Sequence, residues 1–463
     1  MAVILFLLLL LLAAFAYWIS GKDLMTPSLL TIGPFLVCNL FVIMNYGYWG
    51  YDIKSKTVLV IFGALAAQLT GETIIRQIMR PKKIMKTPDS TSRIFERVSS
   101  PKSISQSLLN LPKWVYIIGG IFSIAISIWY SIQQYCNYLQ IVNTMGRMGS
   151  MLKTLRDGQL LVSQGIFYVQ LADNLILKSS ILILSIYASI CIFILLYNWL
   201  VYRYFRLGLG LFLPIICWLY ICTVSTSRIG FAYLICYIVL IYCIILMRIM
   251  RIKGLNSKNM KKKIIKLAIW AFLIGVAIFW LLGYLTDKSG GEVKIWSTLS
   301  NYIGAPIVCF DLKIDEITLS SMPGMHTFMG LYTILRYLGF DIPYYFVRVD
   351  SFCFWNNGAS NVYPGMYSYI RDFGYIGMVI LQFIIGIITG YIWERIKSKK
   401  ANYLLIIFYS YFSFGFILSF ISSAFFTEIL TISNFISMIF LIVFYYLFLK
   451  KKLRNQEKSI ITY

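Results

Sequence analysis

Long blocks of apolar residues recur along the whole sequence, and they limit what the chain can fold into more than any other feature. A helix needs about 20 consecutive, mostly apolar residues to cross a bilayer, and 59% of the 463 residues are hydrophobic. Only 13% are charged, about half the share in a soluble domain. We therefore predict an all-α, polytopic transmembrane bundle of about 11 spans, or 12. The predicted spans are residues 2–19, 29–48, 57–76, 114–133, 179–198, 207–224, 229–247, 265–285, 374–393, 402–422 and 430–449.

The net charge of +24 is concentrated in short segments between the apolar blocks. These basic segments are residues 80–113, 248–266, 395–400 and 450–454. Lys and Arg clusters beside spans mark cytoplasmic loops, so the charge indicates topology and contact with the lipid bilayer rather than nucleic-acid binding. With these segments inside, the C-terminus is cytoplasmic, and an odd number of spans puts the N-terminus outside. One span more or fewer would reverse the N-terminus.

This topology divides the chain into three predicted parts. Residues 1–285 form an N-terminal transmembrane bundle with an outward loop at 134–178. Residues 286–373 form a large outward loop between the eighth and ninth spans, and residues 374–463 form the C-terminal helices and the basic tail. Within the large loop, residues 326–347 are apolar but interrupted by Gly, Asp and Pro, which predicts an interfacial or re-entrant helix. Long loops of this kind are usually functional.

Four charged residues, Arg348, Asp350, Arg371 and Asp372, flank the aromatic and asparagine-rich stretch "FCFWNNGASNVY" at 352–363. Arg371 and Asp372 stand directly before a predicted span, where ionised side chains are costly and usually functional. Aromatic faces stack on sugar rings, and arginine binds phosphate oxygens through two parallel hydrogen bonds. The pattern therefore indicates a site for sugar and phosphate. The plainer interpretation is two local ion pairs at the membrane surface, each of little energetic value.

Three other residues stand out in predicted outward segments. Arg228, in "STSRIGF", lies in a short turn between two spans, where it either binds an anion or extends to lipid headgroups. Arg147 begins the basic stretch "RMGSMLKTLRDG", which either binds substrate or is a solvated loop face. His326 is the sole histidine; it is either a structural residue or a general base, since its ordinary pKa is near 6.5.

Motifs for a metal or a cofactor are missing from the sequence, so we predict neither. The nine cysteines show no metal-ligand spacing. Cys309 and Cys353 both fall in the large outward loop, where a disulfide between them is one option, although the sequence does not give the connectivity.

The segment "NVYPGMYSYIRDFGYIGMVILQFIIGIITGYIWERIK" (361–397) resembles the C-terminal signature of bacterial oligosaccharide repeat-unit polymerases of the Wzy type. "GKDLMTPSLL", "TSRIGF" and "GMHTFMGLYTILRYLG" resemble other family segments in the same order, so the likeness covers roughly residues 20–400. The family often has threonine after Asn-Val-Tyr, where this chain has Pro364.

The resemblance implies a GT-C-like membrane glycosyltransferase of the bacterial cytoplasmic (inner) membrane, with its active site facing outward. Such enzymes polymerise undecaprenyl-diphosphate-linked oligosaccharide repeat units into O-antigen or capsule, and they work with a chain-length regulator and a flippase. Metal-independent transfer is expected. The residues implied as catalytic are Asp372, His326 and Asp350. The residues implied as binding diphosphate or sugar are Arg228, Arg348, Arg371, Arg147, Asn361, Tyr363 and Trp355.

Two other functions compete with polymerisation. An O-antigen ligase shares the topology and the large outward loop. A flippase for the same lipid would place charged residues inside the spans. Glu72 and Glu428 are the main acidic residues in or beside the spans.

Overall fold

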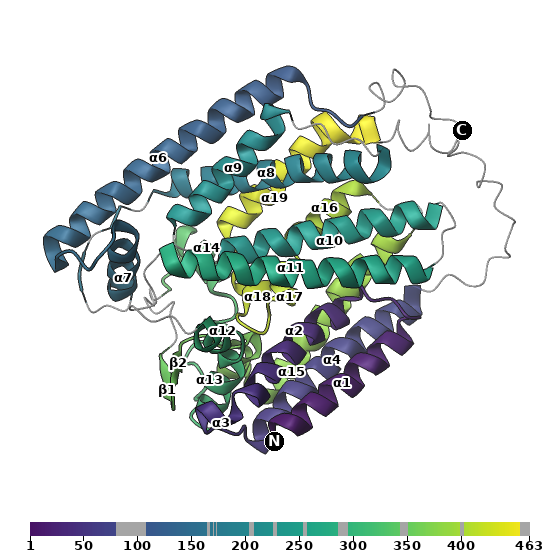
Figure 1. Ribbon diagram of the computed structural model, residues 1–463, viewed down its shortest axis with the longest axis vertical. Coiled ribbons are helices and arrows are strands. Elements are labelled where there is room, and N and C mark those ends of the chain that lie inside the picture. The colour runs from purple at the N-terminus through teal and green to yellow at the C-terminus, as the bar shows by residue number, and fades with distance from the viewer. Residues whose placement is uncertain are drawn as a thin grey trace, which may run out of the picture.

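The computed structural model shows a bundle of long helices with short helices and one β-hairpin gathered at one end (Figure 1). It describes residues 1–79, 108–163, 167–169, 171–172, 174–202, 208–225, 229–252, 257–285, 295–342, 351–398 and 402–453. The all-α prediction is confirmed for these residues, where the hairpin is the only sheet.

Eight helices in the described residues are long and apolar enough to cross a membrane. They are α1 (Ala2–Ile19), α2 (Pro27–Met44), α4 (Ser55–Met79), α6 (Lys113–Met145), α8 (Leu175–Tyr202), α10 (Ile229–Ile252), α15 (Gly365–Lys397) and α19 (Ile432–Phe444), which continues through a π-helical turn, Tyr445–Leu449. Each contains or overlaps a predicted span. The protein is therefore built as a membrane-embedded helical bundle.

The other three predicted spans also fall on apolar helices, but these are shorter or begin with charged residues. The span 207–224 corresponds to α9 (Leu209–Val224), and the span 265–285 lies within α11 (Ser257–Leu285), which starts in a lysine-rich stretch. The span 402–422 is divided into α16 (Tyr403–Tyr411) and α17 (Phe414–Ile417). A short helix, α18 (Ala424–Thr427), then precedes α19.

The short elements form a cap on one end of the bundle; most of them lie at the lower left of Figure 1, and α14 lies higher, near the left end of α10. The cap comprises α3 (Tyr46–Trp49), α12 (Ile295–Ile303), α13 (Ala305–Lys313), α14 (Met329–Tyr337), β1 (Cys353–Trp355) and β2 (Gly358–Ser360). The two strands are antiparallel, with Cys353 opposite Ser360. A short helix, α14, does lie within the predicted interfacial segment. In the predicted loop 134–178, α6 continues to Met145 and α7 (Met151–Ser163) follows, so this segment is more helical than predicted.

A buried carboxylate holds the cap on the bundle. Asp311 of α13 is fully buried, and it accepts hydrogen bonds from the Tyr51 hydroxyl and, at 2.7 Å, from the backbone N–H of Lys54. Burial and this hydrogen bond raise the pKa of Tyr51. Asp315, one turn further along the chain, pairs with Lys54 at 2.6 Å and Lys56 at 3.0 Å. The first turn of α4 is thereby tied to the cap.

Helices α4 and α15 pack so closely that their backbones touch. A Cβ atom added at Gly386 would lie 2.0 Å from the carbonyl oxygen of Gln68, and one added at Gly71 would lie 2.3 Å from that of Phe383. Small residues at such positions let membrane helices approach and gain van der Waals contact. The glycines are therefore required by the packing of this pair.

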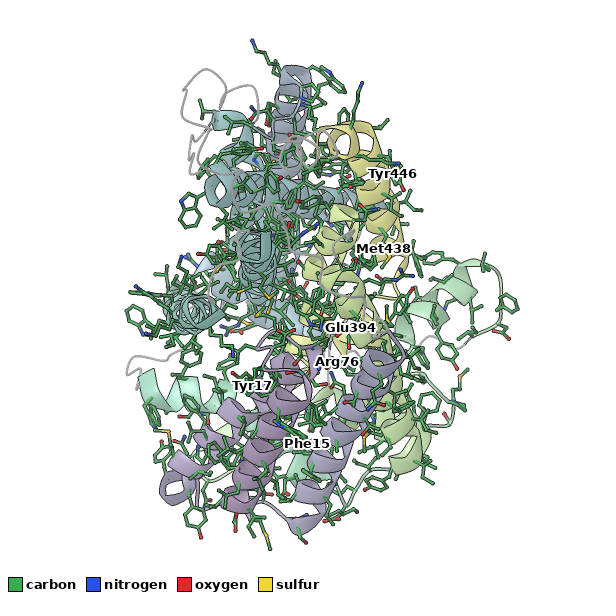
Figure 2. The ribbon with its side chains drawn as sticks, turned by 90° about the vertical axis from the view of Figure 1, so that its right-hand side faces the viewer. Phe15, Tyr17, Arg76, Glu394, Met438 and Tyr446 are labelled. Carbon is green, nitrogen blue, oxygen red and sulfur yellow. The ribbon has the colours of Figure 1, made fainter. Side chains whose placement is uncertain are left out.

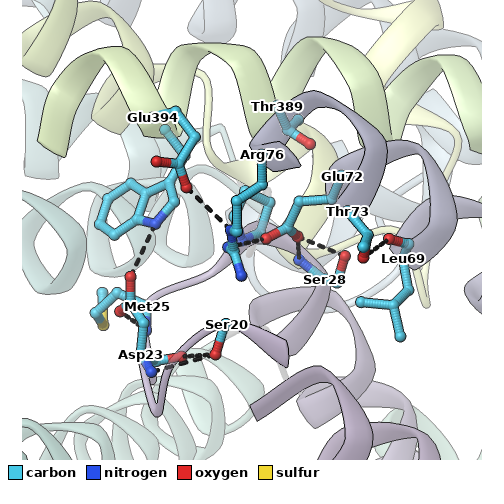
Figure 3. A network of polar contacts seen from close by, with 12 residues as sticks. Ser20, Asp23, Met25, Ser28, Leu69, Glu72, Thr73, Arg76, Thr389 and Glu394 are labelled. Carbon is cyan, nitrogen blue, oxygen red and sulfur yellow. Dashed lines mark hydrogen bonds and ion pairs between the residues drawn. The ribbon is translucent and has the colours of Figure 1, made fainter. Parts of the chain in front are cut away.

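An ion pair between α4 and α15 and a second one within α4 are buried beside this contact (Figure 3). Arg76 donates to Glu72 at 2.6 Å and to Glu394 at 3.0 Å, and its side chain is only 7% exposed. The second oxygen of Glu72 accepts the backbone N–H and the hydroxyl of Ser28 in α2. Figure 2 shows Arg76 and Glu394 together near the middle of the molecule. The network thus joins three helices.

We call this end of α15 the basic end, because further cations gather there. Lys397 pairs with Glu394 and, at 3.8 Å, with Asp23. Lys261 of α11 donates to the Tyr17 hydroxyl at the end of α1 at 2.8 Å. Helix α15 therefore runs from the cap, at Gly365, to the basic end, at Lys397.

We expect Gly386→Ala to destabilise the bundle, because the added methyl group would overlap the backbone of α4. Overpacking of this kind costs about 1–3 kcal/mol. Gly63→Ala is the matched control, since Gly63 lies in the partner helix α4 and its Cβ position has no neighbour within 4 Å. Thermal unfolding in detergent should show a lower midpoint for Gly386→Ala and an unchanged or higher one for Gly63→Ala. Equal midpoints would contradict the close packing.

Candidate functional site

Helix α15 is broken near its start, and the break sets the position of Arg371 and Asp372. Gly374 has φ 67° and ψ −173°, a backbone conformation essentially confined to glycine. The sequence predicts a span that begins at 374, whereas the helix begins at Gly365, directly after Pro364. Arg371 and Asp372 therefore belong to a short helical stretch before the break, and do not precede the helix.

Asp372 holds the turn that carries His326. Its carboxylate is 5% exposed and accepts the backbone N–H of His326 at 3.0 Å and that of Thr327 at 2.6 Å. The backbone N–H of Ser320 donates to the carbonyl of Arg371 at 2.7 Å, which anchors the other side of the same turn. Hydrogen bonds to an ionised carboxylate are stronger than neutral ones. Asp372 thus fixes the approach to α14 and leaves His326 half-buried.

Arg371 and two tyrosines form a layer along the same stretch. The guanidinium of Arg371 lies 5.3 Å from the ring centre of Tyr367, and the ring of Tyr367 stacks on Tyr363 with centres 4.3 Å apart. The Tyr363 hydroxyl donates to the carbonyl of Ser351 at 2.9 Å. Both rings are buried, so they support Arg371 from beneath.

The structure brings together some of the predicted site residues and separates others. His326, Asp372, Arg371 and Tyr363 gather at the cap end of α15. Trp355 packs edge-on against Trp49 of α3, with ring centres 5.7 Å apart, and Asn361 follows β2 and is half-buried. Arg147 lies apart from them, since Figure 1 shows α7 and the adjoining end of α6 well away from α15. The remaining three, Arg228, Arg348 and Asp350, lie outside the described residues.

Arg147 contacts its own loop between α6 and α7. Its Nε donates to the carbonyl of Gly149 at 2.9 Å, and the residue is exposed. This geometry matches the solvated loop face that the sequence left as an alternative.

A mostly apolar cavity with several polar groups in its lining lies between α8, α9, α10, α16, α17 and the start of α19. Its volume is about 100 Å³. The Tyr233 hydroxyl donates to the carboxylate of Glu428 at 2.8 Å, and the hydroxyls of Ser185 and Tyr411 hydrogen-bond at 2.6 Å. The lining residues are Leu182, Ser185, Ser189, Trp218, Gly230, Tyr233, Leu234, Tyr237, Tyr411, Phe414, Glu428 and Asn434. From the sequence, Glu428 was noted only as an acidic residue beside a span. A carboxylate within an apolar block was the one sequence feature that pointed to this cavity.

The broken segment 412–431 supplies one wall of this cavity. It contains α17 and α18 joined by turns, where the sequence predicts the end of the span 402–422 and its connection to the span 430–449. Irregular backbone at membrane depth is tolerated only where protein covers it or where it lines a cavity. The carbonyl of Glu428 accepts hydrogen bonds from Asn434 at 2.5 Å and Thr431 at 3.0 Å. These bonds fix Glu428 at the start of α19.

Helix α18 separates the cavity from the His326 turn. The ring of Phe426 contacts Phe328 at 5.3 Å and Tyr369 at 5.7 Å between ring centres. Glu428 follows two residues later and reaches Tyr233. Residues two apart on a helical turn face nearly opposite directions. The turn and the cavity therefore border the two sides of one segment.

The two cysteines of the cap lie next to each other as free thiols. The thiol of Cys309 donates to the carbonyl of Ser360 at 3.5 Å, and that of Cys353 lies 3.9 Å from the carbonyl of Cys309. The Cys309 thiol lowers the pKa of Cys353 despite the opposing effect of burial. The pair links the hairpin to α13. Among the described residues, no three His, Cys, Asp or Glu side chains gather to hold a metal ion, and the absence of a metal stays a prediction.

The comparisons with known proteins reveal no relative. No protein-family model, no curated protein and no solved structure matches the chain. Function therefore has to be inferred from the residues and their geometry.

We expect Asp372→Ala to free the turn that carries His326, because two backbone N–H groups lose their acceptor. Such a loss costs about 1–3 kcal/mol, which corresponds to roughly 5- to 150-fold faster exchange of the His326 and Thr327 amide hydrogens. Hydrogen exchange followed by mass spectrometry would measure this. Asp341→Ala, at an exposed carboxylate beyond α14, is the control. Unchanged exchange in Asp372→Ala would contradict the anchoring role.

Proposed function

We propose that this protein is a membrane glycosyltransferase that polymerises undecaprenyl-diphosphate-linked oligosaccharide repeat units. The growing chain is transferred from its lipid diphosphate to the end sugar of a new lipid-linked unit, at the outer face of the bacterial cytoplasmic membrane. The product is a surface polysaccharide, either O-antigen or capsule. A chain-length regulator and a flippase are the expected partners.

The observation that carries this proposal is the joining of Arg371 and His326 at the cap end of α15. The carboxylate of Asp372 and the carbonyl of Arg371 hold the His326 turn against the same helical stretch that presents the Arg371 guanidinium. The basic segments at the opposite end favour a cytoplasmic location for that end. On this topology, Arg371 and His326 stand at the level of lipid headgroups on the outer face.

These groups suit transfer from a lipid diphosphate. The acceptor oxygen forms a bond to the anomeric carbon while the bond from that carbon to the diphosphate oxygen breaks. The electron pair leaves with the diphosphate, where Arg371 neutralises the developing charge. The proton of the acceptor hydroxyl passes to a base, for which we favour His326. Asp372 acts as a positioning residue, since both its oxygens accept backbone N–H groups.

The residues outside the described part of the chain keep their predicted roles. Arg228 and Arg348 are proposed to join Arg371 on the diphosphate, and Asp350 remains an alternative base.

One observation favours the flippase alternative. Ionised residues are buried within α4 and α15, where Glu72 and Arg76 are 3% and 7% exposed. A flippase would use such charges to line a path for its substrate. Here Arg76 donates hydrogen bonds to both Glu72 and Glu394, and the hydroxyl of Ser28 donates to the other oxygen of Glu72. This pairing supports a structural role, so polymerisation remains the better proposal.

A strain that lacks the gene separates the three functions. We expect loss of the polysaccharide ladder, with single repeat units still exported. Loss of a ligase would instead leave long chains on undecaprenyl diphosphate. Single units trapped on the inner leaflet would indicate a flippase and overturn the proposal.

Arg371→Ala should reduce the amount of polymer by at least about 100-fold. A cation that stabilises the charge developing on the leaving group lowers the barrier by several kcal/mol. Arg395→Ala is a matched control: Arg395 is exposed on the same helix, and its guanidinium lies 5.4 Å from the ring centre of Tyr391, four residues earlier. Complementation of the deletion strain, with membrane levels compared by immunoblot, would measure both. A normal ladder with Arg371→Ala would remove Arg371 from the site.

A further inference from the structure

We propose that the cavity beside Glu428 is a sugar-binding subsite that takes the terminal, acceptor sugar of the lipid-linked oligosaccharide. The identity of the glycan rests on the proposed function. The subsite itself rests on the shape, the lining and the position of the cavity.

The volume of the cavity suits one sugar ring. One water needs roughly 10–15 Å³ of such space, so the cavity's volume of about 100 Å³ holds several waters or a single pyranose. It is smaller than the roughly 300–1,000 Å³ of pockets that enclose drug-sized ligands. The rest of an oligosaccharide would extend out of it.

The lining of the cavity matches the two kinds of surface on a sugar. Trp218, Tyr237 and Phe414 supply aromatic surface for the C–H faces of the ring, and the ring of Phe414 stacks on that of Tyr233 with centres 4.0 Å apart. The carboxylate of Glu428 accepts hydrogen bonds, as sugar hydroxyls require.

The hydroxyl groups in the lining retain hydrogen-bonding capacity. A hydroxyl donates one hydrogen bond and accepts two. Tyr233 donates to Glu428, Tyr237 donates to the carbonyl of Ser189 at 2.7 Å, and Ser185 and Tyr411 share one hydrogen bond. Tyr233 and Tyr237 therefore retain lone pairs that can accept hydrogens from sugar hydroxyls.

The position of the cavity fits an acceptor site. Helix α10 begins at the cap side, since Arg248 near its other end lies 4.5 Å from the ring centre of Tyr403, shortly after the basic end of α15. Tyr233 is in the first turns of α10, so the cavity opens among the cap-side ends of the helices. Across α18, Phe426 contacts Phe328, two residues after His326. An acceptor sugar held by Glu428 would thus stand across one short helix from the Arg371 and His326 turn.

Photocrosslinking tests the subsite directly. A diazirine-bearing amino acid close to leucine in size is placed at Leu182, which lines the cavity. The probe is the radiolabelled undecaprenyl-diphosphate-linked repeat unit extracted from the deletion strain. We expect a crosslink to the glycan part of the probe, and at least about 10-fold less of it when Glu428→Gln or Tyr233→Phe is added. A crosslink to the lipid part alone, or none, would overturn the proposal.

A cavity-filling variant keeps the test falsifiable if the polar variants fail to fold. Leu234→Phe enlarges a lining side chain and removes no polar group. Leu209→Phe is the control, because Leu209 is 86% exposed at the start of α9. We expect Leu234→Phe to reduce glycan crosslinking and polymer by at least about 10-fold at normal membrane levels. Full crosslinking and a normal ladder in Leu234→Phe would show a void without a ligand and refute the subsite.

The two proposals fail separately. A ligase or a flippase would bind the same lipid-linked glycan, so crosslinking at Leu182 would persist even if the deletion strain disproved polymerisation. Conversely, a lost ladder without crosslinking at Leu182 would support the polymerase and exclude this subsite.

Discussion

The contact between α4 and α15 is the interaction on which the rest of the structure depends. Gly71 and Gly386 bring the two backbones together, and Arg76 ties Glu72 to Glu394 beside them. Removing one partner of such a buried pair costs about 3–5 kcal/mol, because it leaves a charge uncompensated. The other end of α4 is tied to the cap through Lys54 and Asp311. The contact therefore fixes where α15 presents Arg371 relative to the cap.

The two ends of α15 use the same residue types for different purposes. At the basic end, Arg76, Glu72 and Glu394 satisfy one another within the protein, which gives a rigid joint between helices. At the cap end, the carboxylate of Asp372 accepts hydrogen bonds from the backbone of a turn, and the guanidinium of Arg371 lies over the ring of Tyr367. The basic end is therefore a structural joint between helices, whereas the cap end joins a turn and an aromatic layer to the start of α15.

Hydropathy alone predicted the architecture, because a span is a property of local composition. Eight of the predicted spans fall on helices that are long enough to cross a membrane. The break at Gly374 was missed because a glycine before an apolar run resembles a helix start, and the turn that Asp372 holds beside it comes from residues 46 positions earlier in the chain. The Tyr233–Glu428 pair was beyond prediction, since 195 residues separate its members and no local pattern joins them.

The broken segment 412–431 connects these observations physically. A continuous helix would satisfy its own backbone, so interrupting it within the bundle is favourable only where the freed groups find other partners. On one side, Phe426 packs on Phe328 and Tyr369, next to the turn that Asp372 holds. On the other side, Glu428 meets Tyr233 in the cavity. A single element that borders the turn on one side and the cavity on the other would hold the donor and the acceptor of the proposed transfer at a fixed distance from each other.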